Sequence, residues 1–534
     1  MAPMTEARTV LRGGLIVDGA GSEPVRADLA FRDGVIEDVG VGIDVRADDS
    51  TVDVSGRYLL PGFIDAHSHA DGMVFSPGIQ LALLRQGVTT IITGQDGVSY
   101  APGDGNYATE YFGALIGEHP SYRGGGVREL LAAYDNATAI NVGYLVPAGT
   151  VRFEVRGYAH GPATRDELAR MRELVELGLH EGALGLSSGL DYVPGLYADV
   201  NELTELCQVV AVEGGIYVTH MRGGYETKAE MGTAEVEQIA RATGVPVHIS
   251  HYHGPSELLI GLCDGMTARG VDLSFDAYPY RRGCSLLAMP TLPPHLLTGA
   301  ATEVVAALMT PEVRRYLLST WFPALNDTPT MGPEWPDDLT LAHVGARSYA
   351  WSSGMTIRDA AAHAASEPAD FVIDLLIAAR LQVSVVMAVR TQRPYDDLAR
   401  LLSHPAHVMG SDGIFVGSHP HPRGWGSFAK FLRVFVRERA DLTWGQAAQH
   451  LAGRPAERFG LADRGILATG FVADIAVVDP SKVSDIADYR APREYSVGVL
   501  DVFVAGRSVL AGGELTGELA GRGLRRSTTP TPSQ

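Results

Sequence analysis

The feature that most constrains the fold is a series of eight short apolar runs, several of them separated by stretches with helical periodicity. The runs are LLPGFID, VTTIITG, INVGYLVP, GALGLSS, GIYVTH, PVHISH, VDLSFDAY and HVMGSD. Between the third and fourth, TRDELARMRELVELGLH carries a capping box of Thr164 and Glu167, and Leu168, Met171 and Val175 share one helix face. Eight β/α units in succession predict an α/β fold with a (β/α)8 barrel of the TIM type.

The two ends of the chain have a different pattern. Residues 1–61 alternate short apolar runs with Gly, Asp and Pro, as in RTVLRGGLIVDG, and residues 466–520 repeat this in GFVADIAVVDP and VGVLDVFVAGRSVLAGGE. Such alternation is typical of antiparallel strands. We therefore predict one small β-sandwich domain built from both chain ends, with the barrel, residues 62–465, inserted between them.

Two further segments stand apart from the barrel units. The stretch of about 285–400 is too long for a barrel connection and contains helical pieces such as DFVIDLLIAARL, which predicts an inserted helical subdomain near the barrel mouth. Residues 521–534 are polar and contain proline near the end, which predicts a disordered tail.

Composition and charge exclude several classes of function. No apolar stretch reaches the ~18 residues of a membrane span, and the start, MAPMTEARTV, lacks the basic and apolar regions of a secretory signal, so we expect a cytoplasmic protein. Three cysteines without C-x-x-C spacing indicate neither a disulfide framework nor a thiolate zinc site. A net charge of −20 opposes nucleic-acid or anionic-membrane binding as the main activity. A small-molecule substrate is expected.

Residue types that bind metals occur where the predicted strands end. His67 and His69 follow the first strand, His220 ends the fifth, His251 ends the sixth, and Asp412 follows the eighth. Functional groups of such barrels sit at the C-terminal ends of the strands, and two histidines one residue apart on a strand point the same way. One histidine alone has an ordinary structural explanation, but this conjunction predicts a metal site.

These motifs resemble those of the amidohydrolase superfamily, and within it the D-aminoacylase (N-acyl-D-amino-acid deacylase) branch. The shared segments are, in order, PGFIDAHSHAD, GVTTIITG, GLSSGLDYVPG, THMRGG, ISHYH, DAYPY, and GSDG followed by HPHPRGWGSF. The resemblance extends over nearly the whole chain, including the split β domain. It implies a metal-dependent hydrolase that cleaves the amide bond of N-acyl amino acids, with N-acyl-D-amino acids as the expected substrates.

The resemblance also implies two neighbouring metal positions. The first combines the two histidines after strand one with Asp412, and the second uses the histidines of strands five and six. A residue after strand two completes the second position and can bridge both; D-aminoacylases have a cysteine there in a G-N-C-G turn, whereas this chain has Asp96 in Gly-Gln-Asp-Gly. Because oxygen is a harder donor than thiolate, Asp96 as a ligand makes manganese, cobalt or iron more competitive, with zinc still the first expectation, at one or two ions per chain. The alternative is that Asp96 only caps a turn.

By the same resemblance, Asp412 is the catalytic residue. It takes a proton from the water as metal-activated hydroxide attacks the carbonyl, and passes this proton to the leaving nitrogen. Arg423 corresponds to the family arginine that holds the amino-acid carboxylate, and Tyr192 and Tyr278 to tyrosines that contact substrate, with packing at the barrel mouth as their alternative role. A family lysine near the sixth strand is His253 here, which weakens the charge clamp.

Two alternatives remain open. The departures at Asp96 and His253 suit a hydrolase of a cyclic amide or another specialised C–N substrate. A non-catalytic amidohydrolase-like scaffold is the second alternative, and the presence of every metal-ligand residue type opposes it.

Overall fold

Eight parallel strands form the barrel, as predicted. The structure is a computed structural model that describes residues 7–328, 330–389 and 393–526. The strand order is β6-β7-β8-β9-β10-β11-β12-β16, and the barrel closes where Ala66 N donates to Met409 O at 3.0 Å. The strands are β6 (Phe63–Asp65), β7 (Val88–Thr93), β8 (Asn141–Pro147), β9 (Gly185–Gly189), β10 (Ile216–His220), β11 (Val247–Ile249), β12 (Leu273–Ala277) and β16 (His407–Met409).

Helices cover the outside of the barrel, so the strands are buried along almost their whole length. The predicted capping box is present at the start of α5: Thr164 Oγ1 accepts from Glu167 N at 3.4 Å, and Glu167 Oε2 accepts from Thr164 N at 2.7 Å. Met171 and Val175 of that helix are buried. The helices are α1 (Pro77–Leu84), α2 (Asn106–Ile116), α3 (Val127–Tyr134), α4 (Ala148–Arg156), α5 (Arg165–His180), α6 (Val200–Val212), α7 (Ala229–Thr243), α8 (Ser256–Ala268), α16 (Tyr395–Leu402), α17 (Arg423–Lys430), α18 (Trp444–Ala448) and α19 (Arg454–Arg458).

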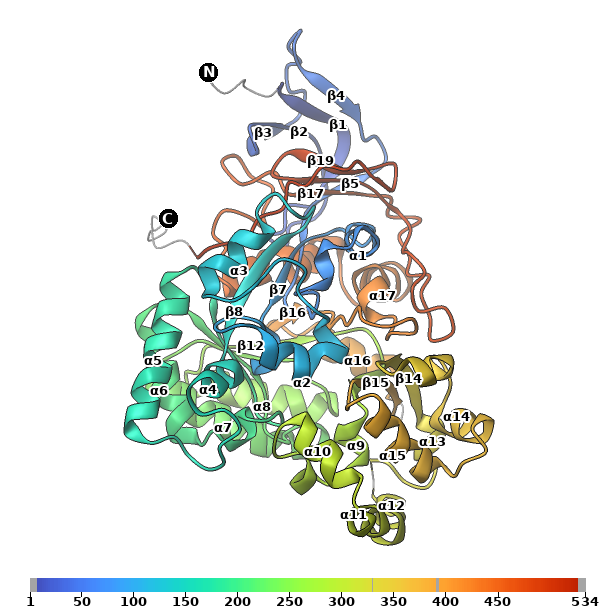
Figure 1. Cartoon of the computed structure of the whole chain (residues 1–534). Helices are drawn as coiled ribbons and strands as arrows, with labels where there is room; N and C mark the ends of the chain where they lie inside the picture. The colour runs from blue at the N-terminus through green and yellow to red at the C-terminus, as the bar shows by residue number, and fades with distance from the viewer. Residues whose placement is uncertain (1–6, 329, 390–392, 527–534) are drawn as a thin grey trace.

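Both chain ends contribute to one nine-stranded sheet, at the top of Figure 1. Its order is β20-β19-β18-β17-β5-β1-β2-β3, with β4 paired to β1. The rings of Phe31 on β2 and Phe503 on β18 lie 5.3 Å apart although three strands separate them in the sheet, so the sheet folds over a shared core in the manner of a sandwich. The strands are β1 (Thr9–Ile16), β2 (Val25–Arg32), β3 (Val35–Gly40), β4 (Ser50–Asp53), β5 (Tyr58–Pro61), β17 (Ile475–Val478), β18 (Val499–Val504), β19 (Arg507–Ala511) and β20 (Glu514–Leu515).

The insertion lies at the lower right of Figure 1 and contains a sheet as well as the expected helices. β13 (Arg282–Leu286), β15 (Val383–Ala388) and β14 (Leu339–Val344) pair antiparallel in that order. This sheet was not predicted from the sequence, because a short apolar run has the same local pattern in a strand and in a buried helix. The helices are α9 (Ala288–Thr291), α10 (Ala301–Leu308), α11 (Pro311–Tyr316), α12 (Phe322–Leu325), α13 (Trp335–Asp338), α14 (Ile357–His363) and α15 (Pro368–Ala378).

The first part of the predicted disordered tail is instead packed against the barrel. Val142 N donates to Arg522 O at 2.9 Å, and Leu524 N donates to Val142 O at 2.8 Å. Leu524 is buried among side chains at the base of the barrel. The prediction of disorder was therefore wrong for residues 521–526. A prediction from composition cannot detect that one leucine of a polar segment is buried and that the backbone beside it forms hydrogen bonds with the barrel. Residues 527–534 lie outside the described part of the chain.

Candidate metal centre

The six predicted ligand side chains meet at the C-terminal end of the barrel. All are buried or nearly so, and they come from the ends of five different strands. They are His67, His69, Asp96, His220, His251 and Asp412.

The first group is held together by closure of the barrel. The ligand atoms of His67, His69 and Asp412 lie within 4.8 Å of one another. His69 Nε2 is 3.3 Å from Asp412 Oδ1 and 3.4 Å from His67 Nε2. Asp412 N donates to His67 O at 2.8 Å, so the hydrogen bonds that join β6 to β16 also bring these residues together.

The second group lies directly beside the first. His220 Nδ1 is 3.0 Å from His251 Nε2. Asp96 stands between the groups, because its Oδ1 is 3.7 Å from both His67 Nε2 and His251 Nε2, and its Oδ2 is 3.5 Å from His69 Nε2. From this position the Asp96 side chain could contact ions in both metal positions.

The backbone is strained where three of these side chains are presented. Asp96, His251 and Asp412 have φ values of 55°, 34° and 49°, which non-glycine residues adopt at a cost of about 1–3 kcal/mol each. In the Asp96 turn, Gly94 has φ 73°, and a Cβ there would lie 2.2 Å from Leu145 O. Asp96 Oδ1 is buried without a hydrogen-bond partner, whereas a turn-capping aspartate accepts from backbone N–H groups. The arrangement favours a ligand over a cap.

The electrostatics of the cluster suit a cation. Burial opposes a positive charge on His69, yet Asp412 and Asp96 raise the pKa of His69 to about 10. Burial likewise opposes ionisation of Asp96, yet His67, His251 and His69 hold its pKa well below the usual range. Ionised carboxylates and imidazoles at these distances fit a divalent metal with nitrogen and oxygen ligands, zinc included.

A buried aspartate that the sequence analysis did not assign supports both groups. Asp276, at the end of β12, has Oδ2 3.3 Å from His67 Nδ1 and 3.0 Å from His248 Nε2, and its Oδ1 accepts from His251 N at 2.9 Å. A carboxylate of this kind fixes which imidazole nitrogen carries the proton. The signal was present in DAYPY, because its Asp lies at a strand end next to the strand of His251.

A second unassigned aspartate holds His220 in the same way. Asp191 Oδ2 lies 3.2 Å from His220 Nε2, and Asp191 Oδ1 accepts from Gly223 N at 2.9 Å. His220 Nδ1 is thereby directed toward His251. Asp191 precedes Tyr192 in GLDYVPG, the segment for which only the tyrosine was predicted to contact substrate.

Arg423 and Tyr278 lie together beside Asp412. Arg423 is 1% exposed, its Nη2 is 2.9 Å from Asp412 Oδ2, and its Cζ lies 4.7 Å from the centre of the Tyr278 ring. None of its side-chain nitrogens makes a well-directed hydrogen bond within the described residues. A buried guanidinium suits a planar anion such as a carboxylate, because its fork of N–H donors can hold both oxygens.

Tyr192 and His253 lie at the other side of the cluster. The Tyr192 ring is 4.8 Å from that of His220. His253 stacks on Tyr225 at 4.7 Å, and its Nδ1 lies 2.8 Å from His251 O. Partial burial (the His253 side chain is 45% exposed) and the neighbouring His251 lower the pKa of His253 to about 4 against the opposing effect of Glu226, so this residue is neutral at pH 7 and adds no positive charge for a substrate carboxylate.

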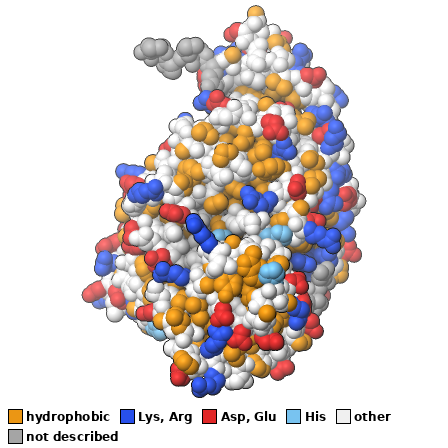
Figure 2. Space-filling model, turned by 45° about the vertical axis from the view of Figure 1, so that its right-hand side comes forward, with side chains coloured by type: hydrophobic (Ala, Val, Ile, Leu, Met, Phe, Trp, Pro, Cys, Tyr) orange, Lys and Arg blue, Asp and Glu red, His pale blue; other side chains and the backbone are white. Residues whose placement is uncertain are grey.

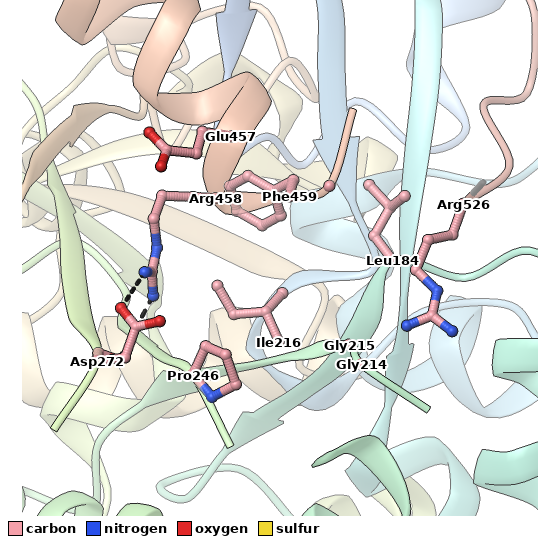
Figure 3. Close-up of a pocket in the computed structure, with 11 residues that line it drawn as sticks. Leu184, Gly214, Gly215, Ile216, Pro246, Asp272, Glu457, Arg458, Phe459 and Arg526 are labelled. Carbon is pink, nitrogen blue, oxygen red and sulfur yellow. Dashed lines mark hydrogen bonds and ion pairs between the residues drawn. The ribbon is translucent and has the colours of Figure 1, made fainter. Parts of the chain in front are cut away.

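A separate cavity of about 240 Å³ lies at the opposite end of the barrel (Figure 3). It is lined by Ile216, the first residue of β10, and by Asp272, which precedes β12 and pairs with Arg458. His220 is at the other end of β10. Because barrel enzymes use the C-terminal ends of the strands, this cavity is not the candidate reaction site.

Comparisons with known proteins agree with this geometry. A family model described as the amidohydrolase family matches residues 50–510. The chain is 32% identical to the D-aminoacylase of Alcaligenes xylosoxydans xylosoxydans, over 97% of each protein. It is 31% identical to the N-acyl-D-glutamate deacylase of the same organism, over 94% of this chain and 93% of the relative. The N-acyl-D-glutamate deacylase of Bordetella bronchiseptica, solved with zinc and a phosphonate mimic of the tetrahedral intermediate, matches with a TM-score of 0.79 at 29% identity, over 97% of this chain and 99% of that one.

Proposed function

The chain belongs to the amidohydrolase family, and we propose that it hydrolyses the amide bond of N-acyl amino acids, with N-acyl-D-amino acids as its substrates. The observation that carries the proposal is the meeting of six side chains of metal-binding types next to Arg423, a buried cation paired with Asp412. A scaffold protein would need neither feature.

Divalent metal, zinc first, is the proposed cofactor, at one or two ions per chain. His67, His69 and Asp412 would hold one ion, His220 and His251 the other, and Asp96 would contact both. The related Bordetella bronchiseptica enzyme was solved with zinc. Bound here, the metal would lower the pKa of a water molecule and polarise the amide carbonyl.

Asp412 is suited to move the proton during hydrolysis. Burial opposes its ionisation, but Arg423, His69 and His67 hold the pKa of Asp412 below the usual range, so it is a carboxylate at neutral pH. It can therefore accept a proton from the attacking water. The same low pKa makes the protonated carboxyl a strong acid, which passes the proton to the leaving nitrogen.

Arg423 would bind the carboxylate of the acyl amino acid. Tyr278 lies against its guanidinium and Tyr192 against His220, so both tyrosines flank the space where the amide would sit. His253, being neutral, would contribute a hydrogen bond rather than a charge.

The test measures hydrolysis of N-acetyl-D- and N-acetyl-L-amino acids, and of a cyclic amide, by wild type loaded with zinc or manganese. We expect release of acetate from the D-substrates. Arg423→Ala should raise KM for acyl amino acids about 10- to 100-fold, as expected for loss of a charge-assisted contact, and should have little effect on an amide without a carboxylate. Cleavage of only the cyclic amide would favour the specialised-substrate alternative, and a protein that binds no metal would favour the scaffold.

Three further observations bear on the partners and the location of the protein. No helix in the described part of the chain is long and apolar enough to cross a membrane. The three cysteines are unpaired, and the net charge is −20. We propose a small-molecule enzyme of the cytoplasm without a nucleic-acid partner.

A further inference from the structure

The cavity at the N-terminal end of the barrel has no part in the proposed reaction (Figure 3). Its volume is about 240 Å³, and its lining includes Leu184 just before β9, Ile216 at the start of β10 and Pro246 just before β11. His220 is at the other end of the five-residue strand β10, about 13 Å from Ile216 at the usual rise of a strand. Side chains fill the interior of such a barrel, so a molecule in this cavity is separate from one at the metal centre.

Arg526 brings to this cavity a cation whose side chain makes no hydrogen bond within the described residues. The side chain is 12% exposed, and its Nε is buried without a partner. The one acidic group that the described chain places within ion-pair distance is Glu213, whose Oε2 lies 4.0 Å from Arg526 Nη2 and 3.2 Å from His180 Nε2. Burial lowers the pKa of Arg526, and the charge of Glu213 offsets this only in part. A buried guanidinium without hydrogen bonds costs free energy, so an anion that supplied acceptors would bind favourably.

The end of the Arg526 guanidinium lies at the wall of the cavity. A Cβ added at Gly214, which also lines the cavity, would lie 3.5 Å from Arg526 Nη1. Figure 3 shows this guanidinium beside Gly214 and Gly215 at the right of the view. Its terminal N–H groups are therefore placed where a ligand in the cavity could accept from them.

The second arginine of the cavity already has its partners. Arg458 donates to Asp272 Oδ1 and, from Nη2, to Val247 O at 3.2 Å. In the left-hand and lower parts of the face shown in Figure 2, Lys and Arg side chains likewise lie next to Asp and Glu. Glu457 also lines the cavity, but it is exposed and lies on the side of Arg458 in Figure 3. The negative end of a ligand would therefore lie at Arg526.

We propose that this cavity binds a small carboxylate with a short apolar chain. The carboxylate would accept two hydrogen bonds from Arg526, and the chain would lie against Ile216 and Phe459, which Figure 3 shows between the two arginines. At ~30 Å³ per water molecule the cavity has room for about eight waters, or for a ligand of about that many non-hydrogen atoms. A phosphate dianion is less suitable, because Arg458 is already paired with Asp272 and one guanidinium remains. The site does not depend on the proposed function.

The experiment uses hexanoate as the probe and measures its binding to the zinc-loaded full chain by ligand-observed NMR at low ionic strength. We expect a Kd of about 1 mM. Hexan-1-ol lacks the charge and acetate lacks the chain, so each should bind at least about fivefold more weakly. Arg526→Gln should weaken hexanoate binding about tenfold, and Arg526→Lys, which keeps the charge without the planar fork, should weaken it less.

Arg525→Gln is the matched control, because it removes the same charge from the neighbouring position. Arg525 does not line the cavity; its side chain is 41% exposed and pairs with Asp135 at 3.0 Å. Its replacement should leave the Kd of hexanoate unchanged. Arg423→Ala should do so too, because Arg423 lies beside the metal centre at the other end of the barrel. Thermal melts verify that each variant is folded.

Several results would overturn the proposal. They are absence of hexanoate binding, equal weakening by Arg526→Gln and Arg525→Gln, and tighter binding of inorganic phosphate than of hexanoate. Loss of binding in Arg423→Ala with full binding in Arg526→Gln would also overturn it, because hexanoate would then occupy the metal centre. None of these measurements uses hydrolysis, so a failure of the proposed function would be seen separately.

Discussion

Replacing Asp276 by asparagine should disturb both halves of the candidate metal centre. The aspartate is completely buried, and it faces His67 Nδ1, His248 Nε2 and the backbone N of His251 at 3.3, 3.0 and 2.9 Å. Its two oxygens can accept from all three groups, but asparagine has only one oxygen. With that oxygen on His251 N, the new NH₂ group would face the two imidazoles, and His67 would have to move its proton to Nε2. That nitrogen points into the cluster and could then no longer bind a metal.

The size of the effect follows from this geometry. Loss of a carboxylate that holds a metal-binding histidine typically lowers metal affinity 10- to 100-fold, which is about 1.4–2.7 kcal/mol. Because Asp276 supports His67 through its side chain and His251 through its backbone, we expect the upper end, about 100-fold. Loss of a hydrogen bond to a buried charge should also lower the free energy of unfolding by about 1.5–3 kcal/mol.

The assay titrates metal-free protein with zinc in competition with a chromophoric chelator and follows thermal unfolding in parallel. Asp474→Asn is the control, because Asp474 is a buried carboxylate, 4% exposed, that pairs with Arg464 beside the β domain, away from the cluster. Unchanged zinc affinity in a folded Asp276→Asn protein would refute the reasoning. An equal loss of zinc affinity in Asp474→Asn would also refute it, because the effect would then not depend on contact with the metal-binding histidines.

Three other predictions concern Asp96, the pH dependence of stability and the C-terminal segment. Asp96→Ala should lose at least one ion per chain by elemental analysis, and Asp96→Cys should shift the preference from manganese toward zinc; equal metal content in wild type and Asp96→Ala would contradict a ligand role. Burial and Arg123 lower the pKa of His119 to about 4, below the unfolded value of about 6.5, so the unfolded chain takes up the proton first as the pH falls. His119 therefore imposes no penalty above pH ~6.5 and destabilises the fold by about 3 kcal/mol by pH ~4; His119→Asn should flatten this part of the pH dependence in chemical unfolding, and an unaltered slope would count against it. Truncation after Ala520 should lower the free energy of unfolding by about 2–4 kcal/mol, because the burial of Leu524 and its backbone hydrogen bonds are lost; an unchanged melting temperature would show that this segment adds no stability.

The sequence predicted the barrel and five of the six clustered side chains because both depend on local patterns. Apolar runs with helical stretches between them specify strands, and the alternation of side chains explains why His67 and His69 point the same way. Asp96 was assigned only through the resemblance of its turn to the family's turn after strand two, with a turn cap as the alternative. The sheet formed by β13, β14 and β15 was missed, because its pairing joins strands separated by long helical segments.

What the sequence by itself determined was therefore the order of the elements and the residue types at the strand ends. Only the tertiary structure decided which distant side chains share the site: Asp276 with His67 and His251, and Asp191 with His220. The physical reason is that a strand's period is set by neighbouring residues. A hydrogen bond between residues far apart in the chain depends instead on how the barrel closes and how the insertion docks on its mouth.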